Sequence, residues 1–280
     1  MRISLSNQLF SATAVVALAA STTGTLADTR SGDSLFGVTS AGITYGPYVR
    51  AELGGIVPVY DNAFWLPPGY DEDPQVFFDL SGDNTLGGSV AVGMDYMNGF
   101  RWDVSLTMLG EQAVTGPWSY TVPETDGPHA SIDATFSSTA LMISGFYSPL
   151  EHQGKNSKVQ PFLTAGVGIA SNAIGDWTRI NLEEDPEKPD RKEYRTFEGA
   201  STSSFAWTIG GGIAWEVGDY QSRPVLLDVT YRYTDLGEAR GGTTPVPGTD
   251  SGRSEPVQAL TFNTVSHSVM FGLRMPLQSY

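Results

Sequence analysis

The chain has 280 residues, no cysteine and a formal net charge of −15, from 16 Lys and Arg against 31 Asp and Glu. The absence of cysteine excludes a disulfide framework and thiolate chemistry, and the scarcity of clustered basic residues argues against nucleic-acid binding. The sequence has 32 glycines, 11% aromatic residues, only 17% charged residues and few apolar runs of helical period, which favours a fold of many strands.

The first 27 residues have the composition of a secretory signal peptide. Arg2 supplies a short positive region, Leu9–Ala20 an apolar core, and Thr25–Ala27 a small-residue end suited to cleavage before Asp28. The apolar core is shorter than the about 20 residues that a membrane-spanning helix needs. We therefore predict a signal peptide over residues 1–27, a polar lead over 28–47 and a single further domain over 48–280.

From residue 48 onward, apolar residues alternate with small or polar ones at the period of two that defines a β-strand. The most distinct pair of runs, over 88–109, flanks the dipeptide Asn98-Gly99, which suits the tight turn of a hairpin. The other runs cover 48–55, 136–147, 163–169, 204–216, 227–233 and 265–277.

Eight strands of about ten residues result, and their seven connections alternate in length. Three connections are short, at 98–99, 148–158 and 218–224, and the other four have about 25 to 33 residues. Short turns at one end and long loops at the other are typical of outer-membrane barrels, whose tilted strands cross the hydrocarbon in about 9 to 11 residues. The sequence thus predicts an all-β fold: an eight-stranded antiparallel up-and-down transmembrane β-barrel with four long extracellular loops.

One face of the strands carries charges of both signs. Its members are four arginines and five carboxylates: Arg50, Arg101, Arg232, Arg274, Glu52, Asp95, Asp103, Glu216 and Asp228. Charges confined in a lumen must nearly cancel, and the Gly, Ala, Ser and Thr beside them suit the narrow interior of eight strands. We predict that these nine residues form a charge network in the lumen. The apolar face, with its aromatic residues near the strand ends, is predicted to contact lipid. A soluble lipocalin-like barrel, with the opposite orientation, is the alternative.

The alternating strands, the signal peptide, the run Tyr231–Gly237 (YRYTDLG) and the final Tyr280 resemble the OmpA-type, opacity-like outer-membrane barrels of Gram-negative bacteria. In that family the final aromatic residue is in phase with the apolar residues of the last strand. Here Tyr280 is out of phase with Phe271 and Leu273. The resemblance implies location in the cell outer membrane. For activity it leaves adhesins, immune-evasion proteins, structural anchors and a few lipid enzymes open.

A lipid A hydrolase would need an outward His, Ser and acid. His267 and Asp235 share the outward face of neighbouring strands, but Ser266 and Ser268 face the other way. We therefore expect no enzymatic activity.

Two acidic clusters are candidate metal ligands. Asp71–Asp73 and the pair Asp79 and Asp83 lack the spacing and glycine of a calcium-binding loop. We expect solvated loops, with no metal site and no cofactor.

The four predicted long loops account for the whole net charge. Segments 57–85, 110–135, 171–203 and 235–262 carry −6, −4, −3 and −2. We expect contact with outer-membrane lipid and lipopolysaccharide through divalent cations, or binding of a basic host or surface ligand, because binding functions concentrate in loops. The predicted function is surface interaction of an adhesin or opacity-like kind. A small porin-like diffusion pore is the alternative, and a lipid A-modifying enzyme is third.

Overall fold

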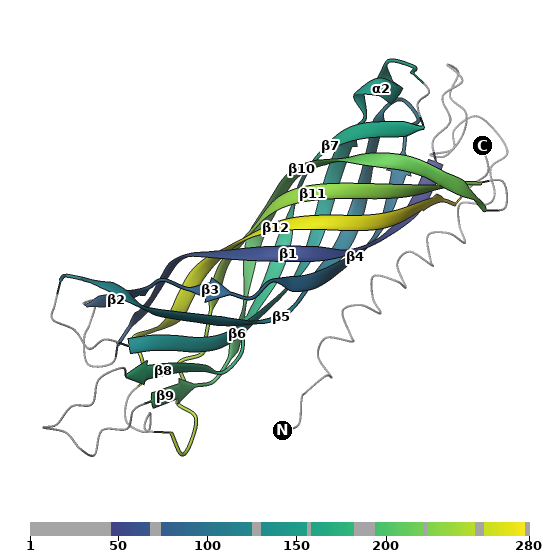
Figure 1. Cartoon of the computed structure of the whole chain (residues 1–280). Helices are drawn as coiled ribbons and strands as arrows, with labels where there is room; N and C mark the ends of the chain where they lie inside the picture. The colour runs from purple at the N-terminus through teal and green to yellow at the C-terminus, as the bar shows by residue number, and fades with distance from the viewer. Residues whose placement is uncertain are drawn as a thin grey trace, which may run out of the picture.

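The computed structural model describes residues 46–67, 74–124, 130–155, 158–181, 194–220, 223–249 and 255–277. Eight long strands form a ring in which each strand pairs antiparallel with the next, and the last closes on the first (Figure 1). The strands are β1 (Gly46–Leu66), β4 (Thr85–Asp95), β5 (Phe100–Val122), β6 (Ala130–Tyr147), β7 (Val159–Ile174), β10 (Ala200–Tyr220), β11 (Arg223–Arg240) and β12 (Gln258–Pro276).

Shorter elements mark the two ends of this ring. The strands β2 (Gln75–Phe78), β3 (Ser81–Gly82), β8 (Trp177–Asn181) and β9 (Tyr194–Phe197) add to the wall at one end, and the helix α2 (Pro149–His152) lies at the other (Figure 1). None of the described helical residues belongs to a helix long and apolar enough to span a bilayer.

The predicted domain boundaries are only partly covered by the described residues. The predicted signal peptide, 1–27, most of the predicted lead, 28–47, and Tyr280 lie outside them. The first strand begins at Gly46, two residues before the predicted start of the barrel domain.

The turn between β4 and β5 lies at the predicted Asn98-Gly99. Positive φ angles occur at Met97 (56°) and Gly99 (88°), not at Asn98. The Asn98 side chain instead accepts a hydrogen bond from the Phe100 N–H (3.1 Å). A Cβ on Gly99 would lie 2.6 Å from the Ser148 carbonyl oxygen of the next turn, so glycine is required there both for its φ and for this close approach.

The outer face of the ring is apolar, as predicted. Leu163 is 63% exposed, Ile209 55%, Phe205 66% and Phe271 57%. Side chains of this kind are mostly buried in water-soluble proteins, whereas lipid-facing residues of a membrane barrel are apolar. The lipocalin-like alternative requires these side chains inside, and the structure excludes it.

The strand β4, with 11 residues, has about the predicted length, but the other seven long strands have 16 to 23 residues, so the predicted length of about ten was wrong for them. β5 has 23 residues, and β1 and β10 have 21 each. At about 3.3 Å per residue and about 45° of tilt, a 21-residue strand rises about 49 Å. The apolar band of a membrane barrel is only about 25 Å tall. The excess forms what we call the outer extension, which includes β2, β3, β8 and β9 and contains much of the four predicted loops.

The outer extension begins where outward side chains become polar. Counted from the apolar band toward the end opposite α2, and leaving tyrosines aside, the first polar outward residue on every long strand except β4 is one of Asp61, Glu111, Thr139, Ser171, Ser203, Asp235 and His267. Beyond this level the outward positions suit water, and below it they suit lipid.

Ile209 lies near the middle of the apolar band on β10, so Ile209→Lys should lower the free energy of unfolding in lipid vesicles by about 2–4 kcal/mol. Urea titration followed by tryptophan fluorescence measures this change. Ser171→Lys, at an exposed outward position at the start of the outer extension, is the matched control and should change stability little. Equal effects of the two substitutions would show that the exterior does not face lipid.

Candidate functional site

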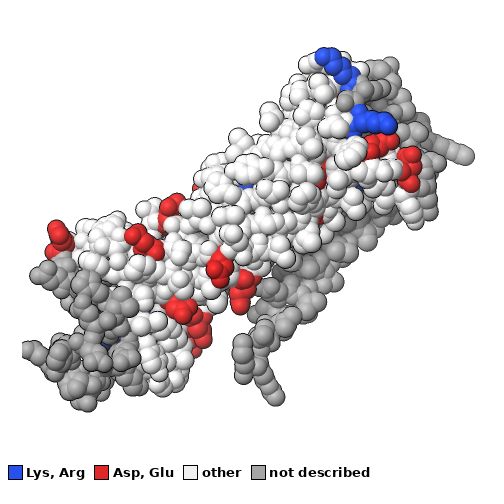
Figure 2. All heavy atoms as spheres, in the orientation of Figure 1, with Lys and Arg blue, Asp and Glu red and all other residues white. Residues whose placement is uncertain are grey.

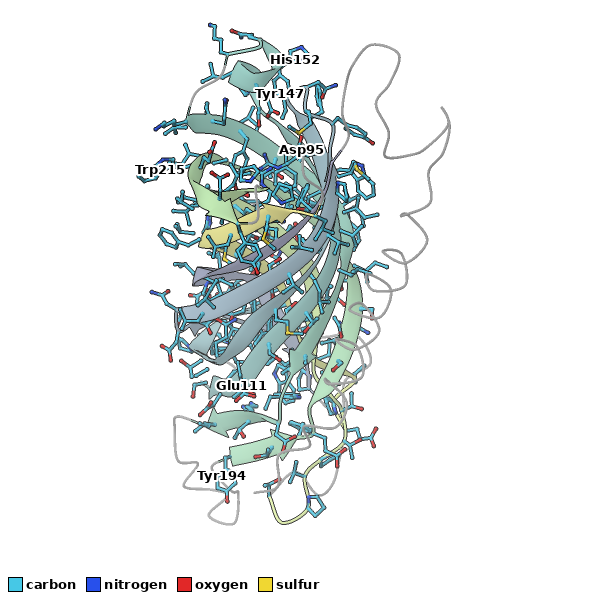
Figure 3. All side chains as sticks on the ribbon, turned by 90° about the vertical axis from the view of Figure 1, so that its right-hand side faces the viewer. Asp95, Glu111, Tyr147, His152, Tyr194 and Trp215 are labelled. Atoms are coloured by element: carbon cyan, nitrogen blue, oxygen red, sulfur yellow. The ribbon has the colours of Figure 1, made fainter. Side chains whose placement is uncertain are left out.

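The interior of the barrel is layered along its axis. A cavity of about 440 Å³ lies at the α2 end, above a layer of buried charged residues. A small cavity of about 40 Å³ follows, lined in part by one cluster of apolar side chains, and a second apolar cluster fills the barrel beyond it. In Figure 3, Asp95 and Glu111 lie toward opposite ends of the barrel.

Arg50 on β1 is the centre of the charged layer. Its Nε and Nη2 donate hydrogen bonds to Oδ2 of Asp103 on β5, at 3.0 and 2.7 Å, and it also forms an ion pair with Glu52. The Tyr48 hydroxyl donates to the same Asp103 oxygen at 3.0 Å. Asp103 is fully buried, so its charge depends on these donors.

Two further arginines complete the ion-paired set. Arg232 on β11 donates two parallel hydrogen bonds to Glu52, from Nη1 to Oε2 at 2.8 Å and from Nη2 to Oε1 at 2.9 Å. Arg274 on β12 donates to Asp95 and to Asp228, both at 3.1 Å. The paired geometry of an arginine with a carboxylate is the strong form of a charge-assisted hydrogen bond.

Several of these bonds pass over an intervening strand. Arg50 and Asp103 are separated by β4, and Glu52 and Arg232 by β12. A Cβ on Gly93 of β4 would lie 2.7 Å from the Asp103 Cβ, and one on Gly272 of β12 would lie 2.6 Å from the Glu52 Cγ. The absence of a side chain at these two glycine positions therefore makes room for the network.

Arg101 differs from the other three arginines. It is 5% exposed, and its guanidinium carbon lies 4.4 Å from the Phe146 ring centre and 4.5 Å from that of Phe162. Its Nε and Nη2 have no hydrogen-bond partner among the described residues. Two aromatic faces thus stabilise this charge where the other arginines have carboxylates.

The structure brings eight of the nine predicted network residues into the interior and leaves Glu216 at its edge. Glu216 is exposed and lines the cavity at the α2 end. The inner set therefore contains four arginines and four carboxylates, and its formal charges cancel.

A cluster of aromatic side chains fills the outer extension and was missed by sequence reasoning. Trp177 stacks on Phe197 with ring centres 4.4 Å apart, and Trp65 packs edge-on to Trp177 at 5.8 Å. Deeper in the same cluster, Tyr60 and Phe136 meet at 5.8 Å. The sequence feature that indicates this cluster is the alternation of apolar and polar residues inside the predicted loops, which is typical of strands that continue.

The exterior of the outer extension is acidic. Nine Asp and Glu side chains are exposed on the described part of the extension: Asp61, Asp79, Asp83, Glu111, Glu124, Asp133, Asp176, Glu198 and Glu255. One basic side chain, Arg240, is exposed in the same described ranges, and it pairs with Glu238 at 2.9 Å. Figure 2 shows acidic atoms over the extension on this face and few charged atoms over the middle of the barrel.

The residues considered for lipid hydrolysis do not form a catalytic group. The His267 Nδ1 lies 2.8 Å from the Tyr231 hydroxyl, while Asp235 accepts a hydrogen bond from the Trp207 indole at 3.2 Å. Ser266 and Ser268 are buried on the inner face.

The acidic residues considered as metal ligands do not form a metal site among the described residues. Asp71–Asp73 lie outside the described residues, and Asp79 and Asp83 are exposed. In the ranges that the structure covers, no group of three or more His, Asp or Glu has a geometry that could hold a metal ion.

The ring, its apolar exterior and its charged lumen define an eight-stranded transmembrane β-barrel. No family model and no curated protein matches the sequence. Neisserial surface protein A is similar in structure, at 14% identity and a TM-score of 0.37 over 82% of this chain and 96% of that one. The outer membrane protein OprG from Pseudomonas aeruginosa is 11% identical, with a TM-score of 0.45 over 82% of this chain and 95% of that one. Ail of Yersinia pestis, the attachment invasion locus protein, is 11% identical, with a TM-score of 0.33 over 82% of this chain and 99% of that one. The fold assignment rests on the strand pairing of this chain.

Asp103→Asn should lower the free energy of unfolding by about 3–5 kcal/mol, because it removes a buried partner from the Arg50 charge. Unfolding in urea, with the folded fraction followed on unheated gels, measures this loss. Glu238→Gln breaks an ion pair whose side chains are 50% and 43% exposed and should cost only about 0–1 kcal/mol. A loss no greater for Asp103→Asn than for this control would contradict the structural role of the charged layer.

Proposed function

We propose that this protein is an opacity-like outer-membrane barrel that binds basic ligands or surfaces through its outer extension. The observation that carries the proposal is the excess of exposed carboxylates on that extension. The predicted signal peptide and the apolar exterior support export and insertion into the outer membrane.

The outer extension is suited to binding because some of its charges lie on hydrogen-bonded strands of the wall. Asp61 and Asp133 lie on β1 and β6, the long strands of the ring, and the aromatic cluster packs behind them. Charges on an ordered scaffold lose little conformational entropy on binding, and a surface of one sign attracts a partner of the opposite sign. Beside anionic lipopolysaccharide, the same carboxylates would need divalent cations for contact with lipid phosphates.

The filled interior supports a binding role over passage of solutes. Any solute would have to disrupt the ion pairs around Arg50 and then displace the aromatic cluster that contains Trp177 and Phe197. An eight-stranded barrel has an interior just wide enough for side chains. We therefore propose a non-conducting barrel without enzymatic activity.

Binding of a fluorescent oligolysine peptide to the refolded protein tests the proposed role. The variant Asp61→Asn/Asp83→Asn/Glu111→Gln/Asp133→Asn should bind at least roughly tenfold more weakly than the wild type, and wild-type binding should weaken steeply as salt is raised. A control with Asp219→Asn neutralises an exposed carboxylate at the α2 end, outside the lining of the cavity, and should change binding little. Equal binding by the fourfold variant and the wild type would remove the basis of the proposal.

Planar-bilayer recording distinguishes the binding role from the porin-like alternative. The refolded wild type should give no steady single-channel steps, because both the ionic layer and the aromatic cluster obstruct the lumen. Asp103→Asn should also remain silent, since it loosens only one of these barriers. Reproducible steps of uniform size in the wild type would establish a pore and overturn the proposal of a closed barrel.

A further inference from the structure

The cavity at the α2 end is a defined space with a polar wall. Its volume is about 440 Å³, within the range of pockets that bind small molecules, about 300–1,000 Å³. Strand ends and turns of the barrel surround it, and the charged layer closes it on the inner side.

The wall of this cavity has one buried cationic group that the ion-paired network leaves over. Arg274 also lines the cavity, but its hydrogen bonds go to Asp95 and Asp228. Arg101 is 95% buried, is flanked by Phe146 and Phe162, and has no hydrogen bond from Nε or Nη2 to any described residue. These two nitrogens are themselves buried, but Arg101 lines the cavity, and a cation on the wall without a hydrogen-bonded carboxylate among the described residues favours an anion in the space beside it.

The same wall carries carboxylates that prevent the site from suiting a simple anion. Glu151 on α2 and Glu216 on β10 both line the cavity. Apart from the two arginines, the other charged groups on the wall are Asp95, which pairs with Arg274, and Lys158. Burial raises the pKa of Glu151 above its ordinary value, and Asp95 adds to this effect, while Arg274, Arg101 and the Gly99 N–H oppose it. An ammonium group near Glu151 would compensate for part of that cost.

We propose that the cavity binds a small zwitterion, specifically a short peptide with free amino and carboxyl termini. Its carboxylate is held by Arg101 and its ammonium group lies toward Glu151 and Glu216. A second carboxylate would be repelled by these two residues, and a purely cationic ligand would be repelled by Arg101 and Lys158. Because Arg101 is buried and Glu216 is exposed at the strand end, the charges of the ligand should be separated along its length, as in a dipeptide.

Titration calorimetry of the refolded full chain in detergent tests this proposal with three probes of nearly equal size. These are alanyl-alanine, its N-acetyl derivative, which is only an anion, and its C-terminal amide, which is only a cation. The free dipeptide should bind at least roughly tenfold more tightly than either blocked form, because each blocked form loses one charge-assisted interaction. Equal binding of all three probes, or binding of none, would overturn the proposal.

Variants locate the two charges of the ligand. Glu216→Gln should weaken binding of the free dipeptide severalfold without weakening binding of the N-acetyl form, whereas Arg101→Gln should abolish binding of both. Lys155→Gln, an exposed change on the neighbouring turn outside the lining of the cavity, is the control and should have no effect.

Glu216→Gln keeps the test decisive if Arg101→Gln fails to fold, because Glu216 is exposed and forms no part of the buried network. An unchanged dipeptide affinity in Glu216→Gln would overturn the assignment. This cavity and the acidic outer extension lie at opposite ends of the barrel, so failure of this test would leave the oligolysine result unaffected.

Discussion

Closure of the backbone hydrogen-bond ring determines the rest of this structure. In a bilayer each unpaired N–H or C=O costs several kcal/mol, so an open sheet edge would be unstable. The pairing of β12 with β1 removes that edge. A ring of only eight strands is narrow, and every inward side chain must share the space with those of the opposite wall. The interior of the lipid-spanning part must therefore be filled and electrically neutral, which the four arginines and four carboxylates of the charged layer achieve.

The ring also continues beyond the lipid, and the polarity of its two faces then reverses. On β6, Leu141 and Ile143 point outward as exposed apolar residues, while Asp133 points outward as a charged one. The inward positions Ile132 and Phe136 are apolar and fully buried at the level of Asp133. One strand thus follows the rule of a membrane barrel along one part and the rule of a water-soluble barrel along the rest, because the surrounding solvent changes from lipid to water.

This reversal explains how much of the fold could be predicted from the sequence. Alternation located all eight strands and the lipid-facing side, because those segments are apolar outward. Because the predicted strands were required to be apolar outward, most of their boundaries fell near the point where the outward residues become polar. The segments that contain Val114 and Ile132 were therefore predicted to be loops, although both residues are buried on strands. The aromatic cluster was lost with them. Counting alternation with either polarity would have detected β6 over most of its length.

For the charged layer, the sequence predicted which residues point inward but not which residues pair. Strand parity placed Arg50, Asp103 and Arg232 inside, but parity does not specify partners, since Arg50 reaches over β4 to Asp103. It also does not show that Arg101 stacks on phenyl rings rather than pairing with a carboxylate. Glu216 has inward parity, yet the register shift between Glu216 and Gly218 and the nearby strand end leave it exposed at the cavity.

The two regions proposed to bind ligands lie at the two ends of the barrel. The ionic layer and the aromatic cluster lie between the cavity at the α2 end and the acidic outer extension, and the two regions share no exposed acidic side chain. Side chains more than about 7–10 Å apart that share no partners usually affect stability independently. The two ends share only the strands of the wall, which are held by hydrogen bonds along their whole length. Each end can therefore carry a charge pattern suited to its own ligand, acidic at the outer end and of mixed sign at the α2 end.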